Sequence, residues 1–302
     1  MQKVIVTGGA GFIGAHIVDA LVERGDDVRI VDNYAAGKRE DRINPKATYH
    51  DVDIRDFEKL APIFKEAIYV FHEAALPRVQ FSIDYPLESY SVNVMGTATV
   101  LRAAHEANVR RVIYASSGSA YGDQNTLPVR EDMLVSPNSP YGLQKYMGEM
   151  LCRSWSEVYG LETVCLRYFN AYGPRTSPDG AYAQALGKFL KQKKEGKPLT
   201  IWGDGTHTRD FTHMTDVVNA NLLAAESKNV GKGEALNIGT GREISVNEIA
   251  ALIGGPKIHE PERREIARTA ADNTRARELI GWQPQKKFEI GVAELKVEFG
   301  IA

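Results

Sequence analysis

The sequence contains very little cysteine and no long apolar run. Cys152 and Cys165 are its only cysteines, too few for a disulfide framework, so we expect reduced thiols in a cytoplasmic protein. No stretch has the roughly 20 consecutive apolar residues that a membrane helix needs, so no membrane partner is expected. Residues 3–6 already form an apolar run, and we expect no signal peptide ahead of them.

The sequence also lacks an excess of either charge. Its 37 Lys and Arg residues nearly balance 39 Asp and Glu residues, for a net charge of −2. Nothing therefore points to nucleic acid as a partner. Cysteine and histidine show no spacing typical of zinc ligands, and no metal site is expected. With 43% hydrophobic and 25% charged residues over 302 positions, the composition is that of a globular protein with a sizeable core.

Short apolar runs alternate with helical periodicity through the first half of the chain. We expect strands at residues 4–7, 28–31, 48–53, 69–72, 111–116 and 163–169, and helices between them, among them 94–108 and 141–159. Repeated strand–helix–strand units predict an α/β fold, a doubly wound parallel sheet of Rossmann type covered on both faces. Functional residues then lie at the carboxyl ends of the strands.

A glycine-rich turn follows the first predicted strand. Gly8, Gly11 and Gly14 suit a tight turn in which backbone amides approach a diphosphate at a helix N-terminus. The second strand ends at Asp32, whose carboxylate can hold both hydroxyls of an adenosine ribose and repels a 2′-phosphate. This context predicts NAD rather than NADP, although the basic Lys38 nearby is of a type that can receive a phosphate.

Tyr141 and Lys145 lie four residues apart and so share one face of a predicted helix. A free tyrosine has a pKa of about 10, and a neighbouring ammonium and a cationic cofactor both favour its phenolate. Lowering the pKa to about 7 requires roughly 4 kcal/mol. The pair predicts a tyrosine base in a cleft, and the alternative reading is a solvated helix face.

The regular alternation ends after residue 170. Helices are expected at residues 182–195, 246–253 and 275–280, with a short strand at 199–202, and Ser245 with Glu248 forms a capping box. We expect a smaller C-terminal α/β lobe that closes over a substrate. The predicted division gives an NAD-binding domain of residues 1–170 plus about 210–240, and a substrate lobe of residues 171–209 and 241–302.

The motifs of the whole chain now identify a resemblance. In order they are Thr7-Gly8-Gly9-Ala10-Gly11-Phe12-Ile13-Gly14, Tyr121-Gly122, Tyr141 with Lys145, Arg167-Tyr168-Phe169-Asn170, Gly203-Asp204-Gly205, Arg209-Asp210-Phe211 and Asn237-Ile238-Gly239-Thr240-Gly241. From residue 3 to about 284 the chain resembles the extended short-chain dehydrogenases/reductases, and within them the nucleotide-sugar 4-epimerases that act on UDP-glucose and UDP-galactose. The resemblance implies an isomerase that uses NAD, a UDP-sugar substrate, and a homodimer formed through the helices at 94–108 and 141–159.

The resemblance also assigns roles to single residues. Ser117 works beside Tyr141, which takes the proton of the sugar's C4 hydroxyl, while Lys145 orients the nicotinamide ribose and lowers the tyrosine pKa. Ser119 stands where similar dehydratases and decarboxylases carry an acid, which argues against both of those reactions. Cofactor contacts are implied for Gly8, Gly11, Phe12, Ile13, Gly14, Asp32, Asn33, Asp53, Ile54, Ala74, Ala75, Asn93, Tyr141, Lys145 and Phe169. Substrate contacts are implied for Ser117, Ser119, Asn170, Arg209, Arg263, Glu265 and Thr269.

Some of these assignments have competing readings. Asn93 is equally well a helix N-cap, and Asp53 with Ile54 equally well a strand end and part of the core. Glu262 stands where the family has an arginine that grips the diphosphate, so Arg263 or Arg264 is expected to replace it. The small Thr269 leaves room for an N-acetyl group, which predicts that UDP-N-acetylglucosamine and UDP-N-acetylgalactosamine are also accepted.

Three alternatives to a UDP-hexose 4-epimerase remain at this point. Two belong to the same family, a nucleotide-sugar reductase and a UDP-glucuronate epimerase. The third belongs to another class, a non-catalytic NAD-binding sensor or scaffold. The joint presence of Ser117, Tyr141 and Lys145 favours an enzyme, because a sensor has no need of all three.

Overall fold

A seven-stranded parallel sheet forms the centre of the larger domain in the computed structural model, which describes residues 1–176, 185–262 and 267–301. Its strand order is β11-β6-β5-β4-β1-β2-β3, and every neighbouring pair is parallel. The strands are β1 (Lys3–Thr7), β2 (Asp27–Asp32), β3 (Thr48–Asp51), β4 (Tyr69–His72), β5 (Arg111–Ser117), β6 (Glu162–Tyr168) and β11 (Lys232–Ile238). The predicted Rossmann-type fold is confirmed.

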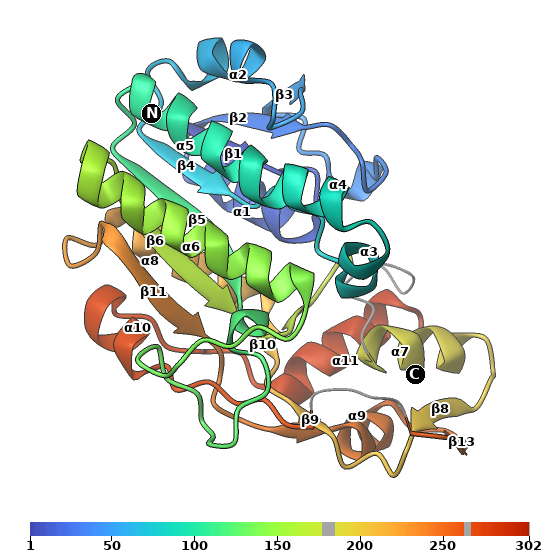
Figure 1. Cartoon of the computed structure of the whole chain (residues 1–302). Coiled ribbons are helices and arrows are strands. Elements are labelled where there is room, and N and C mark those ends of the chain that lie inside the picture. The colour runs from blue at the N-terminus through green and yellow to red at the C-terminus, as the bar shows by residue number, and fades with distance from the viewer. Residues whose placement is uncertain (177–184, 263–266, 302) are drawn as a thin grey trace.

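Helices cover both faces of this sheet because its strands are apolar on both sides. One face carries α2 (Phe57–Phe64), α5 (Thr97–Glu106) and α6 (Pro140–Tyr159), whose inner residues share a hydrophobic core with β4 and β5. The other face carries α1 (Phe12–Glu23), α8 (Met214–Glu226) and α10 (Thr274–Ile280). Figure 1 shows α5 and α6 side by side in front of the sheet, with α1 and α8 behind it.

The helix expected at 94–108 is part of a longer helical run. After α3 (Val79–Asp84), α4 (Pro86–Tyr90) begins with proline at its first position, where the missing N–H costs nothing. It passes into a π-helical turn, η2 (Ser91–Gly96), and then into α5. π-Helical turns are rare and often mark functional positions, and this one contains Asn93.

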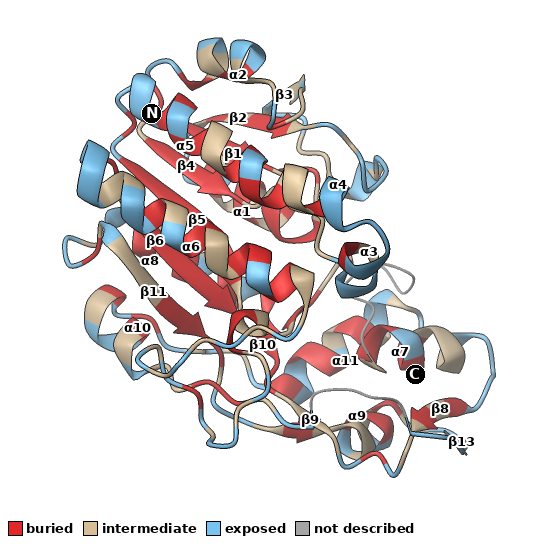
Figure 2. Cartoon of the chain, viewed as in Figure 1, coloured by how far each residue is buried: buried red, intermediate tan, exposed pale blue. Residues whose placement is uncertain are grey.

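The C-terminal part of the chain builds a second, smaller core. Helices α7 (Ala185–Lys194), α9 (Val246–Ile253) and α11 (Phe288–Glu298) pack around β8 (Leu199–Trp202), which pairs in parallel with β13 (Lys257–Glu260). Buried residues of these helices face one another in Figure 2. The capping box of Ser245 and Glu248 opens α9 as predicted, and the expected smaller α/β lobe is present.

Two short strand pairs lie where the larger domain meets the lobe. They are β7 (Ala171–Tyr172) with β10 (Thr212–His213), and β9 (Thr208–Arg209) with β12 (Ile244–Ser245). Because β7 follows β6 and β10 precedes α8, these pairs connect the end of the large sheet to the lobe. They position the residues after β6 and around Arg209 between the two parts.

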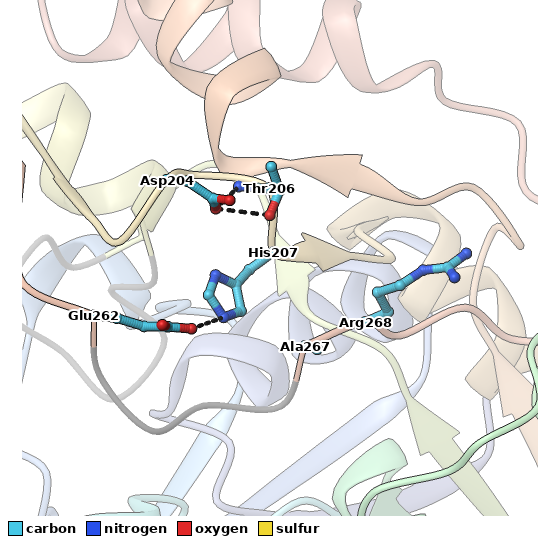
Figure 3. A pocket seen from close by; sticks show the side chains of 6 residues that line it. All are labelled: Asp204, Thr206, His207, Glu262, Ala267 and Arg268. Carbon is cyan, nitrogen blue, oxygen red and sulfur yellow. Dashed lines mark hydrogen bonds and ion pairs between the residues drawn. The ribbon is translucent and has the colours of Figure 1, made fainter.

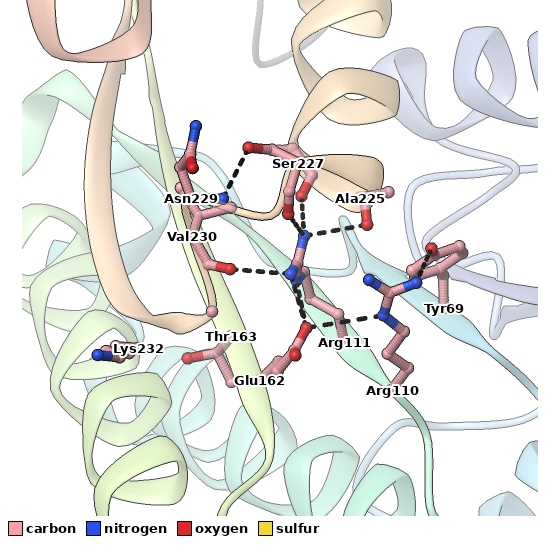
Figure 4. A network of polar contacts seen from close by, with 12 residues as sticks. Tyr69, Arg110, Arg111, Glu162, Thr163, Ala225, Ser227, Asn229, Val230 and Lys232 are labelled. Atoms are coloured by element: carbon pink, nitrogen blue, oxygen red, sulfur yellow. Dashed lines mark hydrogen bonds and ion pairs between the residues drawn. The ribbon is translucent and has the colours of Figure 1, made fainter. Parts of the chain in front are cut away.

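The buried Arg111 joins the large sheet to α8 (Figure 4). Its guanidinium binds Glu162 on β6 and donates to carbonyl oxygens at and just beyond the C-terminus of α8. The acceptors are those of Ala224 at 2.8 Å, Ala225 at 3.0 Å, Ser227 at 2.7 Å and Val230 at 2.8 Å. Carbonyls at this end of a helix have no partner within it and carry partial negative charge, so a buried cation stabilises them.

The described ranges contain neither a membrane-spanning helix nor a metal-binding cluster of side chains. Among residues 1–176, 185–262 and 267–301, no helix is long and apolar enough to cross a membrane. In the same ranges, no group of three or more His, Cys, Asp or Glu residues is arranged to hold a metal ion.

Candidate active site

The glycine-rich turn after β1 is built for close approach of backbone. Gly8 has φ +70°, and a side chain there would place its Cβ 2.7 Å from the amide nitrogen of Ala74. A Cβ on Gly14 would lie 2.2 Å from the carbonyl oxygen of Gly8. Gly11 caps α1 without a side-chain hydrogen bond, so the first amides of the helix remain available to an anion. This geometry fits the diphosphate of a dinucleotide.

Phe12 and Ile13 follow this turn as the first residues of α1. Both side chains are buried in the core between α1 and the sheet. The Arg42 guanidinium lies 5.6 Å from the centre of the Phe12 ring. Both side chains therefore pack the start of α1 against the sheet beside the turn.

Asp32 ends β2 beside the turn, as expected. Its carboxylate accepts hydrogen bonds from the amides of Ala10 at 3.0 Å and Tyr34 at 2.8 Å. Burial raises the pKa of this carboxyl, and the two amide hydrogen bonds oppose that effect. The carboxylate is thus held in place by backbone on both sides of the turn, in the position that a ribose-binding acid needs.

The third strand ends earlier than predicted, at Asp51 rather than Asp53. Asp53 lies in the following turn, where Arg55 binds its two oxygens at 2.9 and 2.7 Å and Asn33 donates to it at 3.1 Å. The side-chain hydrogen bond from Arg55 lowers the pKa of Asp53. Ile54 is buried in the core beneath α5, so of the two readings its packing role is the one that the structure shows.

Asn93 fixes the loop that follows β4. From the π-helical turn, its Oδ1 accepts from the Leu76 amide at 2.7 Å, and its Nδ2 donates to the Leu76 carbonyl at 3.1 Å. The same Nδ2 donates to Gln144 of α6 at 2.7 Å. Asn93 is not a helix N-cap, since it lies inside a continuous helical run. It ties the half-buried Ala74 and Ala75 between the glycine turn and α6.

Tyr141, Lys145 and Ser117 meet at the carboxyl end of β5. Helix α6 starts at Pro140, with Ser139 as N-cap, so Tyr141 lies in its first turn. Tyr141 and Lys145 are 8% and 4% exposed, which excludes the solvated-face reading. The Lys145 ammonium donates to the Ala115 carbonyl at 2.7 Å and lies 5.9 Å from the Tyr141 ring centre. Tyr141 and Ser117 share a side-chain hydrogen bond.

Ser119 adds a third hydroxyl next to those of Tyr141 and Ser117. Its amide donates to the Ser117 hydroxyl, which in turn donates to the Ser119 hydroxyl, both at 3.1 Å. The Ser119 side chain, a neutral hydroxyl, therefore lies beside the hydroxyls of Ser117 and Tyr141. An acid at this position would bring a negative charge to the same place.

The protein by itself does not lower the pKa of Tyr141, contrary to expectation. Burial raises it to about 12, while the hydrogen bond with Ser117 lowers it and the charge of Glu73 raises it. Burial lowers the pKa of Lys145 to about 8, against the charge of Glu73, which raises it. The ammonium is directed to the Ala115 carbonyl rather than to the phenol, so a further positive charge is needed to stabilise the phenolate.

A buried ion pair holds α6 on the sheet. Glu149 accepts from Arg167 of β6 in a two-pronged contact, at 2.8 and 2.7 Å, and both side chains are at most 3% exposed. Ser116 also donates to Glu149. The close approach requires Gly148, because a Cβ there would lie 2.1 Å from the Tyr114 hydroxyl. This pair was not among the predicted site residues.

The residues after β6 carry the site toward the lobe. Phe169 is buried beside Gly118, where a Cβ would lie 3.0 Å from the Phe169 ring. Asn170 has the left-handed φ of +33° and donates to the Asp210 carbonyl at 2.7 Å. Both lie next to the segment of Ser117, in the order that the sequence motif implied.

Asp210 organises the lobe side of the site. Its buried carboxylate accepts from the amides of Thr240 at 2.8 Å, Gly241 at 2.9 Å and Ala271 at 3.0 Å. Its own amide donates to the Thr269 hydroxyl at 3.2 Å. The adjacent Arg209 donates to the Thr208 carbonyl at 2.9 Å. Arg209 and Thr269, two predicted substrate contacts, are therefore held together through Asp210.

A cavity of about 450 Å³ opens in the lobe (Figure 3). Its walls come from Asp204, Thr206, His207, Glu262, Ala267 and Arg268. Glu262, which replaces the family arginine, lies across from His207, with 3.7 Å between Oε1 and Nε2. The predicted contacts Arg263 and Glu265, and the alternative Arg264, lie outside the described residues.

Three charged residues near the site, Arg167, Glu149 and Glu73, were not predicted, although the sequence contains a signal for each. Arg167 follows the apolar run of residues 164–166 within a strand, and Glu149 follows Lys145 by four residues, so it lies on the same inner face of α6. Glu73, whose charge acts on both Tyr141 and Lys145, directly follows the apolar strand β4. A charged residue at a position that should face the core is the signal common to all three.

Because it is buried and paired, the Glu149–Arg167 contact makes a testable prediction about stability. Arg167→Met leaves an unpaired buried carboxylate and should lower the free energy of unfolding by about 3–5 kcal/mol. The double variant Arg167→Met with Glu149→Leu removes both charges and should recover most of that loss. Urea unfolding followed by circular dichroism measures both, and equal losses in the single and double variants would contradict the assignment.

The chain is similar to known proteins over most of its length. The sequence profile of the NAD dependent epimerase/dehydratase family matches residues 4–239. A putative UDP-glucose 4-epimerase of Methanocaldococcus jannaschii is 41% identical over 298 residues, covering 96% of this chain and 95% of that protein.

Two solved structures extend the likeness to the fold. A UDP-glucose 4-epimerase of Thermotoga maritima with UDP-glucose has a TM-score of 0.93 and 36% identity, covering 99% of this chain and 98% of that one. A UDP-N-acetylglucosamine 4-epimerase of Methanobrevibacter ruminantium, in complex with UDP-N-acetylmuramic acid, has a TM-score of 0.92 and 33% identity, with the same two coverages. The chain therefore belongs to the NAD-dependent epimerase/dehydratase family of extended short-chain dehydrogenases/reductases, and it is an NAD-dependent enzyme that resembles UDP-sugar 4-epimerases throughout its length.

Proposed function

We propose that this enzyme inverts the configuration at C4 of UDP-hexoses, interconverting UDP-glucose with UDP-galactose and UDP-N-acetylglucosamine with UDP-N-acetylgalactosamine. The observation that carries the proposal is the pair of the buried Tyr141 and the half-buried Ser117 beside the buried Lys145 at the carboxyl end of β5. Ligands of such sheets bind at the carboxyl ends of the strands. The pair therefore lies where a sugar hydroxyl can reach it.

The residues around the glycine turn fit NAD. The turn at Gly8 and Gly14 has no space for side chains, and Asp32 is held at the end of β2 for a ribose. When bound there, NAD would supply the hydride acceptor and donor that inversion at C4 of the sugar requires. The loop of Ala74 and Ala75, fixed by Asn93, completes the cofactor wall.

Tyr141 is the proton acceptor in this proposal. Its phenolate takes the proton of the C4 hydroxyl as the 4-keto sugar forms, and returns it after the sugar has turned. Because the pKa of Tyr141 is raised to about 12 in the protein alone, the phenolate requires the positive charge of the oxidised nicotinamide in addition to Lys145. The Ser117 hydroxyl, which donates to Ser119 in the resting site, can turn to donate a hydrogen bond to the developing oxyanion.

The smaller lobe binds the nucleotide diphosphate in this proposal. Arg209 has the two-pronged guanidinium that suits a diphosphate, and Asp210 holds it near Thr269 and the turn at Thr240. This arrangement supports the division into an NAD-binding domain and a nucleotide-sugar-binding lobe. The sugar turns over while its diphosphate stays bound. First one face of C4 and then the other would therefore lie toward the same nicotinamide site.

Neutral Ser119 favours epimerisation over elimination or decarboxylation, since neither reaction has its acid here. Incubation with a panel of UDP-sugars, UDP-glucuronate included, tests the choice among family reactions when C4 inversion is followed by NMR. A reductase would instead show a net change in free NADH. Cytoplasmic location remains a prediction, consistent with the buried free thiols of Cys152 and Cys165.

The role of Tyr141 is tested by Tyr141→Phe, which removes the hydroxyl and keeps the ring. We expect kcat for UDP-galactose epimerisation to fall about 10²- to 10⁴-fold, the usual contribution of a general base. Tyr146→Phe, a half-buried tyrosine on the same helix, is the matched control and should keep wild-type activity. Epimerisation at the wild-type rate in Tyr141→Phe would refute the mechanism, and unchanged NAD binding would show that the fold persists.

The sugar range is tested at Thr269. In Thr269→Tyr the larger side chain should reduce turnover of UDP-N-acetylglucosamine at least about tenfold relative to UDP-glucose, the order of discrimination that pocket sterics give. Thr269→Val keeps the size but removes the hydroxyl that accepts from Asp210, so it should retain both substrates. A wild-type enzyme that converts UDP-galactose but neither N-acetylated sugar would sink the prediction of broad range.

A homodimer formed through α5 and α6 is the predicted assembly. The outer face of α6 exposes Leu143, Met150 and Val158, which are 39%, 41% and 68% exposed and recur at helical spacing. Met95, just before α5, is 62% exposed. Figure 1 places these two helices side by side on the outside of the sheet. Together they offer an apolar face to a second copy.

Charges on that face should separate the copies. The double variant Leu143→Glu with Met150→Glu should be a monomer by light scattering at micromolar concentration, where the wild type is a dimer. Leu134→Glu, at a more exposed apolar residue outside both helices, should leave the dimer intact. A monomeric wild type would overturn the prediction.

A further inference from the structure

His72 is a buried histidine that the proposed mechanism does not use. It ends β4, and its side chain is 1% exposed. Each ring nitrogen lies within hydrogen-bond distance of a buried threonine hydroxyl. Nδ1 is 2.7 Å from Oγ1 of Thr7, at the end of β1, and Nε2 is 3.0 Å from Oγ1 of Thr97, at the start of α5. The imidazole therefore bridges the end of a strand and the helix that follows the π-helical turn.

Thr97 decides which nitrogen of the His72 ring carries the proton. The Thr97 hydroxyl has one proton to give, and its oxygen lies 2.7 Å from the carbonyl oxygen of Asn93. Because a carbonyl oxygen can only accept, the hydroxyl donates to it; otherwise two acceptors would face each other at this distance. The Thr97 oxygen is then left to accept, so Nε2 of His72 donates to it. The hydrogen bonds thus assign the Nε2–H tautomer to His72.

The same reasoning orients the hydrogen bonds on the other side of the ring. In the neutral Nε2–H tautomer, Nδ1 of His72 is an acceptor, so the Thr7 hydroxyl donates to it. The Thr7 oxygen in turn accepts from the amide of Ala74 at 3.4 Å. The result is a single directed chain of hydrogen bonds, and its members in order are Ala74, Thr7, His72, Thr97 and Asn93.

Both ends of this chain hold the loop that follows β4. Ala74 packs so closely on the glycine turn that a Cβ on Gly8 would lie 2.7 Å from the Ala74 amide nitrogen. At the other end of the loop, the Asn93 side chain binds the amide and the carbonyl of Leu76 at 2.7 and 3.1 Å. His72 therefore links two anchors of one loop that belong to different elements, β1 and the π-helical turn.

An uncharged imidazole suits the surroundings of His72. Burial, and after it the charge of Lys145, lower the pKa of His72 to about 3. The centre of the Tyr114 ring lies 5.6 Å from that of the His72 ring and 5.2 Å from the Lys145 ammonium nitrogen. Both hydrogen-bond partners of the imidazole are neutral hydroxyls, which do not stabilise a cation as a carboxylate does. The charges around the ring and the direction of the hydrogen bonds agree.

We propose that His72 is a positioning residue of the cofactor site, an uncharged imidazole protonated on Nε2 that joins the two anchors of the loop after β4 and so fixes the wall against which NAD binds. His72 acts through Ala74 and Asn93 and touches neither NAD nor the sugar in this role. The inference rests on the binding of NAD at the glycine turn and not on the proposed epimerisation, so its tests use no sugar.

The tautomer of His72 can be measured directly. Long-range proton–nitrogen NMR spectra of the NAD-loaded protein with labelled histidine distinguish the two neutral tautomers and the imidazolium, and His72→Gln assigns the signal. We expect the Nε2–H form at neutral pH. A ring protonated on Nδ1, or on both nitrogens, would overturn the proposal whatever reaction the enzyme catalyses.

Thr97→Val removes the hydroxyl that orients the chain and keeps the shape of the side chain. We expect bound NAD to exchange with free, isotope-labelled NAD about tenfold faster, the size of effect expected when a buried polar group loses its partner. The Nδ1–H form of His72 should also become populated. Thr97→Ser keeps the hydroxyl and should retain both wild-type properties. Exchange as fast in Thr97→Ser as in Thr97→Val would contradict the proposal, because the hydroxyl would then not matter.

Thr99→Val is the matched control on the same helix. The Thr99 hydroxyl donates to the Met95 carbonyl at 3.0 Å, the same contact with the residue four positions earlier that Thr97 makes with Asn93. Since Thr99 lies outside the chain of His72, its replacement should change neither NAD exchange nor the tautomer. Equal effects of Thr97→Val and Thr99→Val would overturn the proposal. If Thr97→Val does not fold, the tautomer of the wild type still decides.

Discussion

The buried ion pair between Glu149 and Arg167 is the constraint on which the active site depends. It joins the inner face of α6 to β6, with Ser116 of β5 as a third contact. Desolvating two charges is expensive and is offset only when the geometry satisfies both. The pair therefore fixes one rotation and one height of α6 on the sheet. Lys145 and Tyr141, one and two turns earlier on the same helix face, take their places from it.

The charge balance above this pair explains why the site needs its cofactor. Burial alone makes Tyr141 a very weak acid and Lys145 a weaker base than usual. The protein alone therefore favours the neutral phenol. In the proposed mechanism, a bound oxidised nicotinamide would supply the positive charge that favours the phenolate, so the base would form only in the loaded site.

In the smaller lobe, too, a buried charge positions site residues, and there it is the single carboxylate of Asp210. Asp210 accepts hydrogen bonds from amides of the 240–241 turn and from the amide of Ala271. Backbone donors can stabilise a buried carboxylate as well as a salt bridge can. This places Arg209 and Thr269, which are distant in sequence, on one side of the cleft. The two proposed substrate contacts are thereby positioned by a residue that need not touch the substrate.

The sequence alone determined the parallel sheet, the glycine turn, Asp32 and the Tyr141–Lys145 face, because each depends on spacing within one segment or on strand order. Helix bounds at 94–108 and the strand end at Asp53 were wrong, since a π-helical turn and an Asp53–Arg55 contact are decided by neighbours that are not local. Only the tertiary structure showed that Asn93 ties a loop, that Glu149 pairs with Arg167, and that Glu73 accepts a hydrogen bond from Tyr168. Pairings between buried charges depend on which segments the fold brings together, and burial then decides their pKa values, so no local pattern contains them.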